Sequence, residues 1–108
     1  MPRVAVPVTQ SSRAGTVLPA ATTGDAVNNH SVANDGRVIL IVKNTGASSR
    51  DITFLTTVSV DGLTAPSRIE SVPAGETQLF GPFPVNDYGS TLKVDVAHAE
   101  LTINAIRI

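Results

Sequence analysis

The chain has 108 residues, no cysteine, and a net charge of −1 with only 16% charged residues. This length suits one domain with one modest hydrophobic core, and the lack of cysteine excludes a disulfide framework and thiolate metal sites. The weak charge argues against nucleic acid and against a polybasic membrane anchor, since both need clustered Lys and Arg.

The first 24 residues differ from the rest because they are rich in Ser, Thr, Ala and Pro. Their only charged side chains are Arg3 and Arg13. Valines alternate near the start, at Val4, Val6 and Val8. Pro7 lacks a backbone donor, so a strand here would lie at a sheet edge. We interpret residues 1–24 as an extended arm, with an unordered terminus as the alternative, and residues 25–108 as the folded domain.

Neither a secretory signal peptide nor a membrane span is expected. The arm has no apolar run of the length that a signal peptide needs, and no segment approaches the roughly 20 apolar residues of a transmembrane helix. We therefore expect a soluble protein that is made in the cytoplasm and either stays there or leaves as part of something larger.

From residue 25 onward, turn signals alternate with short runs rich in β-branched residues. The turn signals are Asn34-Asp35-Gly36, Thr45–Ser49, Asp61-Gly62 and Pro73-Ala74-Gly75. The expected strands span residues 37–44, 51–60, 68–72, 76–80, 92–96 and 101–108. Segment 37–44 is apolar on both faces, which indicates a strand that is buried on both sides or central in a packed sandwich. Segment 51–60 alternates apolar residues with Thr and Ser.

The composition supports the same fold class. The chain contains 14 Val, 12 Thr and 7 Ile, and its 8 Gly and 7 Pro are spread along its length. β-branched side chains favour strands, and frequent Gly and Pro interrupt helices. We predict an all-β protein: a single antiparallel β-sandwich or small barrel of seven to eight short strands, with an extended N-terminal arm.

Motifs that carry catalysis or metal binding are missing from the sequence. The two histidines, His30 and His98, fall beside predicted turns, and we interpret both as solvated turn residues. No third nitrogen or sulfur ligand is available for zinc. The acidic residues are scattered, and four aromatic residues without tryptophan are a poor basis for a sugar-binding cleft. We predict that the protein is not an enzyme and has no cofactor, metal site or catalytic residue.

The segment 72–84, VPAGETQLFGPFP, concentrates stiff and apolar residues. It holds three prolines and two of the three phenylalanines. Phe80 is expected to fill the core. Pro82 and Pro84 prevent Phe83 from joining a regular central ladder, so Phe83 is either a lid on the end of the sandwich or an exposed anchor for a partner.

These segments carry a resemblance to a known family. The run NDGRVILIVKNTGASSRDITF, then SVDGLTAPSR, SVPAGETQLFGPFPVNDYG and a closing strand ending in AIRI resemble the small β-sandwich capsid decoration (head accessory) proteins of tailed bacteriophages. The resemblance covers residues 34–108 and includes no catalytic motif. The arm has no counterpart that can be matched residue by residue.

The resemblance implies a decoration or cement protein on the outside of the expanded capsid. Its partner would be the major capsid protein of the same virus, and it would form a homo-oligomer, with a trimer favoured. Neither nucleic acid nor a membrane would be a partner, and the location would be the capsid surface of the virion. The contact candidates are Arg3, Val4, Val6, Val8, Arg13, Pro82, Phe83, Pro84 and Tyr88. The alternatives are a tail, head-fibre or adhesion component and, less favoured, a carbohydrate-binding module.

Overall fold

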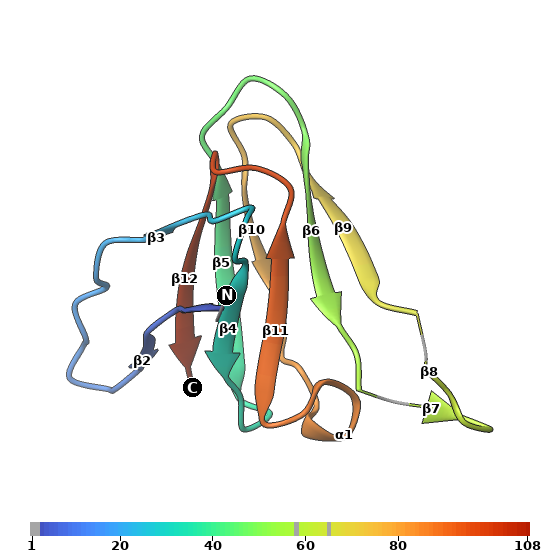
Figure 1. Ribbon diagram of the computed structural model, residues 1–108. Helices are drawn as coiled ribbons and strands as arrows, with labels where there is room; N and C mark the ends of the chain where they lie inside the picture. The colour runs from blue at the N-terminus through green and yellow to red at the C-terminus, as the bar shows by residue number, and fades with distance from the viewer. Residues whose placement is uncertain (1–2, 58, 65) are drawn as a thin grey trace.

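The computed structural model of the protein describes residues 3–57, 59–64 and 66–108. Two five-stranded sheets pack face to face as a β-sandwich (Figure 1). The first sheet has the order β1 (Val4–Ala5), β4 (His30–Ala33), β11 (Thr91–Val96), β6 (Arg50–Leu55), β9 (Arg68–Val72). The second has the order β10 (Thr77–Phe80), β5 (Val38–Asn44), β12 (Leu101–Arg107), β2 (Val8–Gln10), and β3 (Thr22–Thr23) also pairs with β12. The predicted all-β sandwich is confirmed.

The hydrophobic core lies between the sheets and is built from alternate residues of their long strands. In β5, Val38, Leu40 and Val42 are at most 1% exposed, and the two isoleucines between them are half-buried. β5 lies between β10 and β12, so the prediction of a central strand at residues 37–44 is confirmed. From the first sheet, Ile52 and Phe54 of β6 face this row with no exposed surface.

The arm accounts for the one departure from a purely antiparallel sandwich. β1 pairs with β4 in parallel, and β2 pairs with β12 in parallel. Two parallel strands need a long connection between them. For β1 and β4, residues 6–29 form this connection. As predicted, the strands around Pro7 lie at edges: β1 ends the first sheet and β2 ends the second. Pro7 itself falls between them, where no ladder donor is needed.

Seven of the twelve strands have four or more residues, which matches the predicted seven to eight. The remaining five have two or three residues each; three of them belong to the arm, and β7 (Ser59–Val60) and β8 (Leu63–Thr64) form a hairpin. Asp61 and Gly62 connect this hairpin with φ angles of 54° and 78°. Positive φ at both positions is the two-residue turn that an Asp-Gly pair favours, so this turn was correctly predicted.

The expected single strand over 51–60 is wrong, because β6 ends at Leu55. The amide of Thr57 donates to the carbonyl of Asp87 at 2.8 Å, which draws the chain away from the sheet. The hairpin then projects from the sandwich (Figure 1, right). Val58, which we had assigned to that strand, lies outside the described residues.

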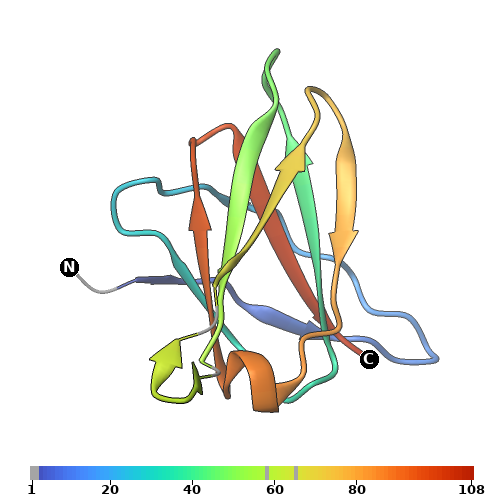
Figure 2. The same cartoon turned by 90° about the vertical axis from the view of Figure 1, so that its right-hand side faces the viewer.

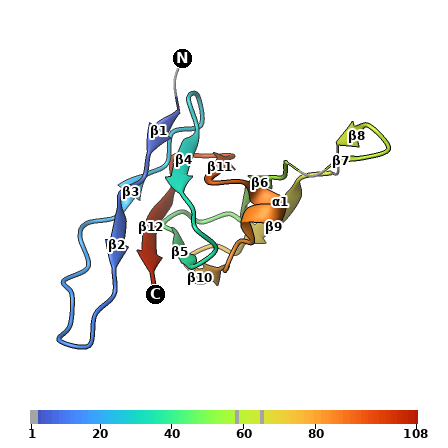
Figure 3. The same ribbon diagram turned by 90° about the horizontal axis from the view of Figure 1, so that it is seen from below.

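The two lateral sides of the sandwich are built differently. On one side the sheets end in β9 and β10, and Figure 2 looks onto this side. On the opposite side the sheets end in β1 and β2, and the chain passes directly from one sheet to the other (Figure 3). Below β9 and β10 the chain forms a single helical turn, α1 (Val85–Tyr88), which the sequence did not predict.

Candidate functional site

We define the tip as residues 81–89, GPFPVNDYG, which include α1. Phe83 of the tip is only 4% exposed. Its ring centroid lies 4.9 Å from that of Phe54 and 5.2 Å from that of Tyr88, and the Tyr88 ring meets it edge-on at 84°. Of the two roles considered for Phe83, the lid is therefore the one that the structure supports. While the fold is intact, Phe83 can present only a small part of its side chain to a partner.

Asn34 fastens the tip to the rest of the sandwich. Its side-chain amide donates to the carbonyls of Phe83 and Gly89, both at 3.0 Å. Its side-chain oxygen accepts the amide of Gly36 at 3.0 Å, and the residue is 6% exposed. The sequence analysis took Asn34 only as a turn signal. From sequence alone, an Asn that forms a turn cannot be told apart from a buried Asn whose side chain binds distant carbonyls.

A groove of about 360 Å³ opens between the tip and the two edge strands β9 and β10. Phe54, Phe80 and Phe83 contribute to its apolar lining. On the β9 side, Arg68 and Glu70 pair at 2.8 Å. The tip adds two exposed prolines and the half-buried Tyr88, so Pro82, Pro84 and Tyr88 of the predicted contact residues share one surface.

The alternating valines of the arm do not share a surface. Val4 is 37% exposed, Val6 is 3% exposed, and Val8 packs against the core while half-buried. Val6 belongs to the core cluster, so it is unavailable to a partner in this structure. Only Val4 among them presents much apolar surface.

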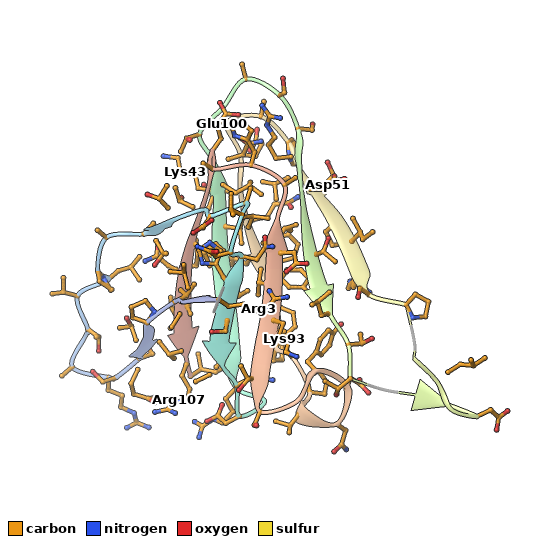
Figure 4. The ribbon with its side chains drawn as sticks, viewed as in Figure 1. Arg3, Lys43, Asp51, Lys93, Glu100 and Arg107 are labelled. Carbon is orange, nitrogen blue, oxygen red and sulfur yellow. The ribbon has the colours of Figure 1, made fainter. Side chains whose placement is uncertain are left out.

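The two arginines of the arm have different surroundings. Arg3 pairs with Asp95 of β11 at 2.6 Å and also donates to the carbonyl of His30 at 3.1 Å. Figure 4 places Arg3 over β4 and β11. Arg13 is exposed in the loop over residues 11–21. Arg3 therefore holds the arm to the first sheet, whereas Arg13 extends into solvent.

The interpretation of His30 as a solvated turn residue is wrong. His30 begins β4 and is completely buried. The sequence held one signal for this: Val32 lies two residues later, and alternate residues of a strand share a face. His98 does lie in a connection, as predicted, and its side chain is 44% exposed.

Asp25 organises the turn that precedes β4. Its carboxylate accepts the amides of Asn28 at 2.9 Å and Val27 at 3.0 Å, and the side-chain amide of Asn28 at 3.1 Å. The backbone bonds from Asn28 and then Val27 hold the pKa of Asp25 below its usual value of 3.8, because they stabilise the ionised form.

Two segments project from the sandwich in different directions, as seen from below (Figure 3). One is the loop over residues 11–21, where Val17 is 90% exposed and Leu18 is 47% exposed. The other is the β7–β8 hairpin, where Leu63 is 74% exposed. These side chains place apolar surface at the outer limits of the molecule, and none of them was among the predicted contact residues.

Among residues 3–57, 59–64 and 66–108, no three His, Asp or Glu side chains gather in a way that could hold a metal ion. The same residues form no helix with the length and apolar character of a membrane span. Comparisons with protein-family models, with curated proteins and with solved structures found no match.

Proposed function

We propose that this protein is a structural attachment protein: a capsid decoration protein of a tailed bacteriophage that binds the major capsid protein. It would act without catalysis, as a homo-oligomer (a trimer is favoured), on the outside of the expanded shell. The observation that carries the proposal is the apolar surface on the two projecting segments, where Val17 and Leu63 are largely exposed and Leu18 is 47% exposed. Contiguous exposed apolar surface marks sites of protein contact, and Val17 and Leu18 are adjacent. The resemblance over residues 34–108 supplies the identity of the partner.

The remaining surface suits the same role. The protein carries a net charge of −1, so it repels neighbouring copies weakly. The tip is a rigid surface, because proline fixes φ at Pro82 and Pro84 while Phe83 is held in the core. A rigid surface loses little conformational entropy on binding. Many identical weak contacts would then stabilise the bound shell by mass action.

The runner-up is a tail, head-fibre or adhesion component of the same particle. Projecting apolar segments serve such a component equally well, so surface chemistry alone does not separate the two. Copy number does, because a decoration protein occupies every equivalent shell site and a fibre occupies few. We expect between about one-third and one copy per shell subunit in quantitative mass spectrometry of purified particles. A handful of copies would favour the fibre.

Binding to expanded shells tests the contact surface directly. Val17→Ser with Leu18→Ser, and separately Leu63→Ser, should each weaken binding by about tenfold or more, as loss of a central apolar contact does. Val27→Ser is the matched control, since Val27 is 85% exposed but lies in the turn before β4 rather than on a projection. Unchanged binding of both variants, or failure of the wild-type protein to bind shells, would contradict the proposal.

A further inference from the structure

The buried imidazole of His30 lies between the arm and the turn that leads into β4. Its Nε2 atom is 2.9 Å from the amide nitrogen of Asp25, and its Nδ1 atom is 3.1 Å from the carbonyl oxygen of Val4. The residue has no exposed surface. One side chain thus joins β1 to the 25–29 turn through both ring nitrogens.

These partners specify the protonation state of the ring. The amide of Asp25 can only donate, so Nε2 must be unprotonated and accept. The carbonyl of Val4 can only accept, so Nδ1 must carry the proton. The geometry requires a neutral imidazole in the Nδ1–H form, and a second proton would place two donors 2.9 Å apart.

The charged groups around His30 come from each element that packs against it. The arm contributes Arg3, whose guanidinium reaches the His30 carbonyl at 3.1 Å and pairs with Asp95 of β11. The turn contributes Asp25, whose carboxylate is occupied by the amides of Asn28 and Val27. Beyond Gly24, the connection between β11 and β12 holds His98 and Glu100, and Glu100 pairs with Arg50 at 2.9 Å. The guanidinium of Arg3 reaches the backbone of His30, and the carboxylates of Asp95, Asp25 and Glu100 already have partners, so a proton on His30 would gain no free carboxylate among these groups.

The contacts of β1 are few compared with those of the sandwich. β1 has two residues, and two backbone bonds flank His30, from Val4 to Asn29 and from Val6 to Ser31, both at 2.9 Å. β4 itself pairs with β11 over four residues. A segment held by so few bonds opens at a lower free energy than the core does.

We propose that His30 is a proton-sensitive latch for the arm. Protonation of Nε2 removes the bond from Asp25 and leaves a charge in a buried site, so β1 and the turn separate from β4 while the two sheets stay folded. Histidine is the side chain whose charge ordinarily changes in the mildly acidic range. The inference concerns the isolated chain and does not depend on attachment to a capsid.

Hydrogen exchange and NMR of the full chain test the latch. At about pH 7.5, imidazole nitrogen shifts should show the Nδ1–H form of His30. Between about pH 7.5 and 5, after correction for intrinsic exchange, amides of residues 4–6 should exchange at least about tenfold faster relative to those of β12, in step with protonation of His30. The Nε2–H form at neutral pH, protonation without faster exchange of the arm, or simultaneous loss of protection in β12 would each overturn the proposal.

Two variants test whether His30 causes the pH-dependent change in hydrogen exchange of the arm, called the transition below. His98→Gln removes the only other histidine and should leave the transition intact. His30→Gln keeps a donor and an acceptor without a titrating ring and should abolish the pH dependence of arm exchange. Persistence of the transition in His30→Gln, or its loss in His98→Gln, would refute the assignment. Where His30→Gln does not fold, the measurements on the wild-type chain decide.

Discussion

The tip and the arm were both expected to be contact elements, yet they are attached to the sandwich in different ways. The tip is attached through the core: Phe83 packs against Phe54, and Asn34 binds two tip carbonyls. The arm is attached through sheet edges, one buried valine and the imidazole of His30. The tip is therefore held mainly by a buried aromatic ring, and the arm mainly by edge pairings and side-chain bonds.

This difference in attachment shows that two apolar segments of one chain can differ in how firmly they are held to the fold. A buried aromatic side chain contributes several times the free energy of a short edge pairing. A surface mounted on the tip keeps its shape whatever the conditions. A surface mounted on the arm depends on edge pairings and on the burial of Val6, so opening the whole arm would expose part of the core.

The largest expected effect tests whether the tip belongs to the core. Phe83→Ala should lower the free energy of unfolding by about 3–5 kcal/mol, because it leaves a cavity beside Phe54 and removes an edge contact with Tyr88. Val85→Ala is the control within the tip, since Val85 is 41% exposed, and it should cost about 0.5 kcal/mol or less. Urea unfolding measures both. A cost below about 1 kcal/mol for Phe83→Ala would mean that the tip is not fastened through this ring.

The second effect concerns the two hydrogen bonds by which the Asn34 side chain holds the tip to the 34–36 turn. Asn34→Ala should cost about 2–3 kcal/mol, because it leaves the carbonyls of Phe83 and Gly89 without their donor. Asn104→Ala is the matched control: its side-chain amide donates to the carbonyl of Pro19 at 3.0 Å on the exposed surface. That variant should lose about 0.5 kcal/mol. If thermal unfolding showed equal losses of stability in the two variants, burial of the Asn34 hydrogen bonds would be unimportant.

The third effect separates the two valines of the arm. Val6→Ala removes two buried methyl groups and should cost about 1–2 kcal/mol. Val4→Ala, at a position 37% exposed, should cost less than half as much. Chemical denaturation compares the two directly. If both variants were as stable as the wild-type chain, the arm would contribute nothing to the core.

The smallest effect concerns the turn that joins the arm to β4. The pKa of Asp25 is lowered from 3.8 in the folded protein, so the carboxylate favours folding above that value. This contribution is lost as pH falls through the folded pKa, below 3.8. Asp25→Asn should lower stability slightly near neutral pH, and the two proteins should become equally stable as pH falls below the pKa of folded Asp25. Stability measured by denaturation at several pH values checks this, and an identical acid profile in both proteins would contradict it.

Local patterns predicted much of the fold correctly. Asp61-Gly62 forms the expected hairpin turn, and the doubly apolar run at 37–44 became the central β5. Both follow from physics that acts within a few residues: positive φ at a turn, and an apolar strand that buries one face and half-buries the other. The end of β6 at Leu55 was missed, because it depends on a bond from Thr57 to Asp87, 30 residues away.

The candidate site was only partly predictable. The sequence pointed to the tip and the arm, and all four of the tip's candidates line the groove, although Phe83 is almost completely buried. It missed the exposed side chains of Val17, Leu18 and Leu63, because neither a loop nor a two-residue strand carries a periodic signal of exposure. The capsid partner, the trimer and the virion location stay predictions until the copy-number and binding experiments are made.

The sequence by itself determined the all-β class, most strand positions and the turns, because backbone preferences and alternation are local properties. Only the tertiary structure decided which sheet edge each arm strand joins, that Val6 and Phe83 lie in the core, and that His30 is a buried neutral ring. These outcomes depend on groups that are distant in sequence: Val4 is 26 residues from His30, and Asn34 is 49 residues from Phe83. Hydrogen bonds and packing between such groups exist only once the two sheets have closed over the core.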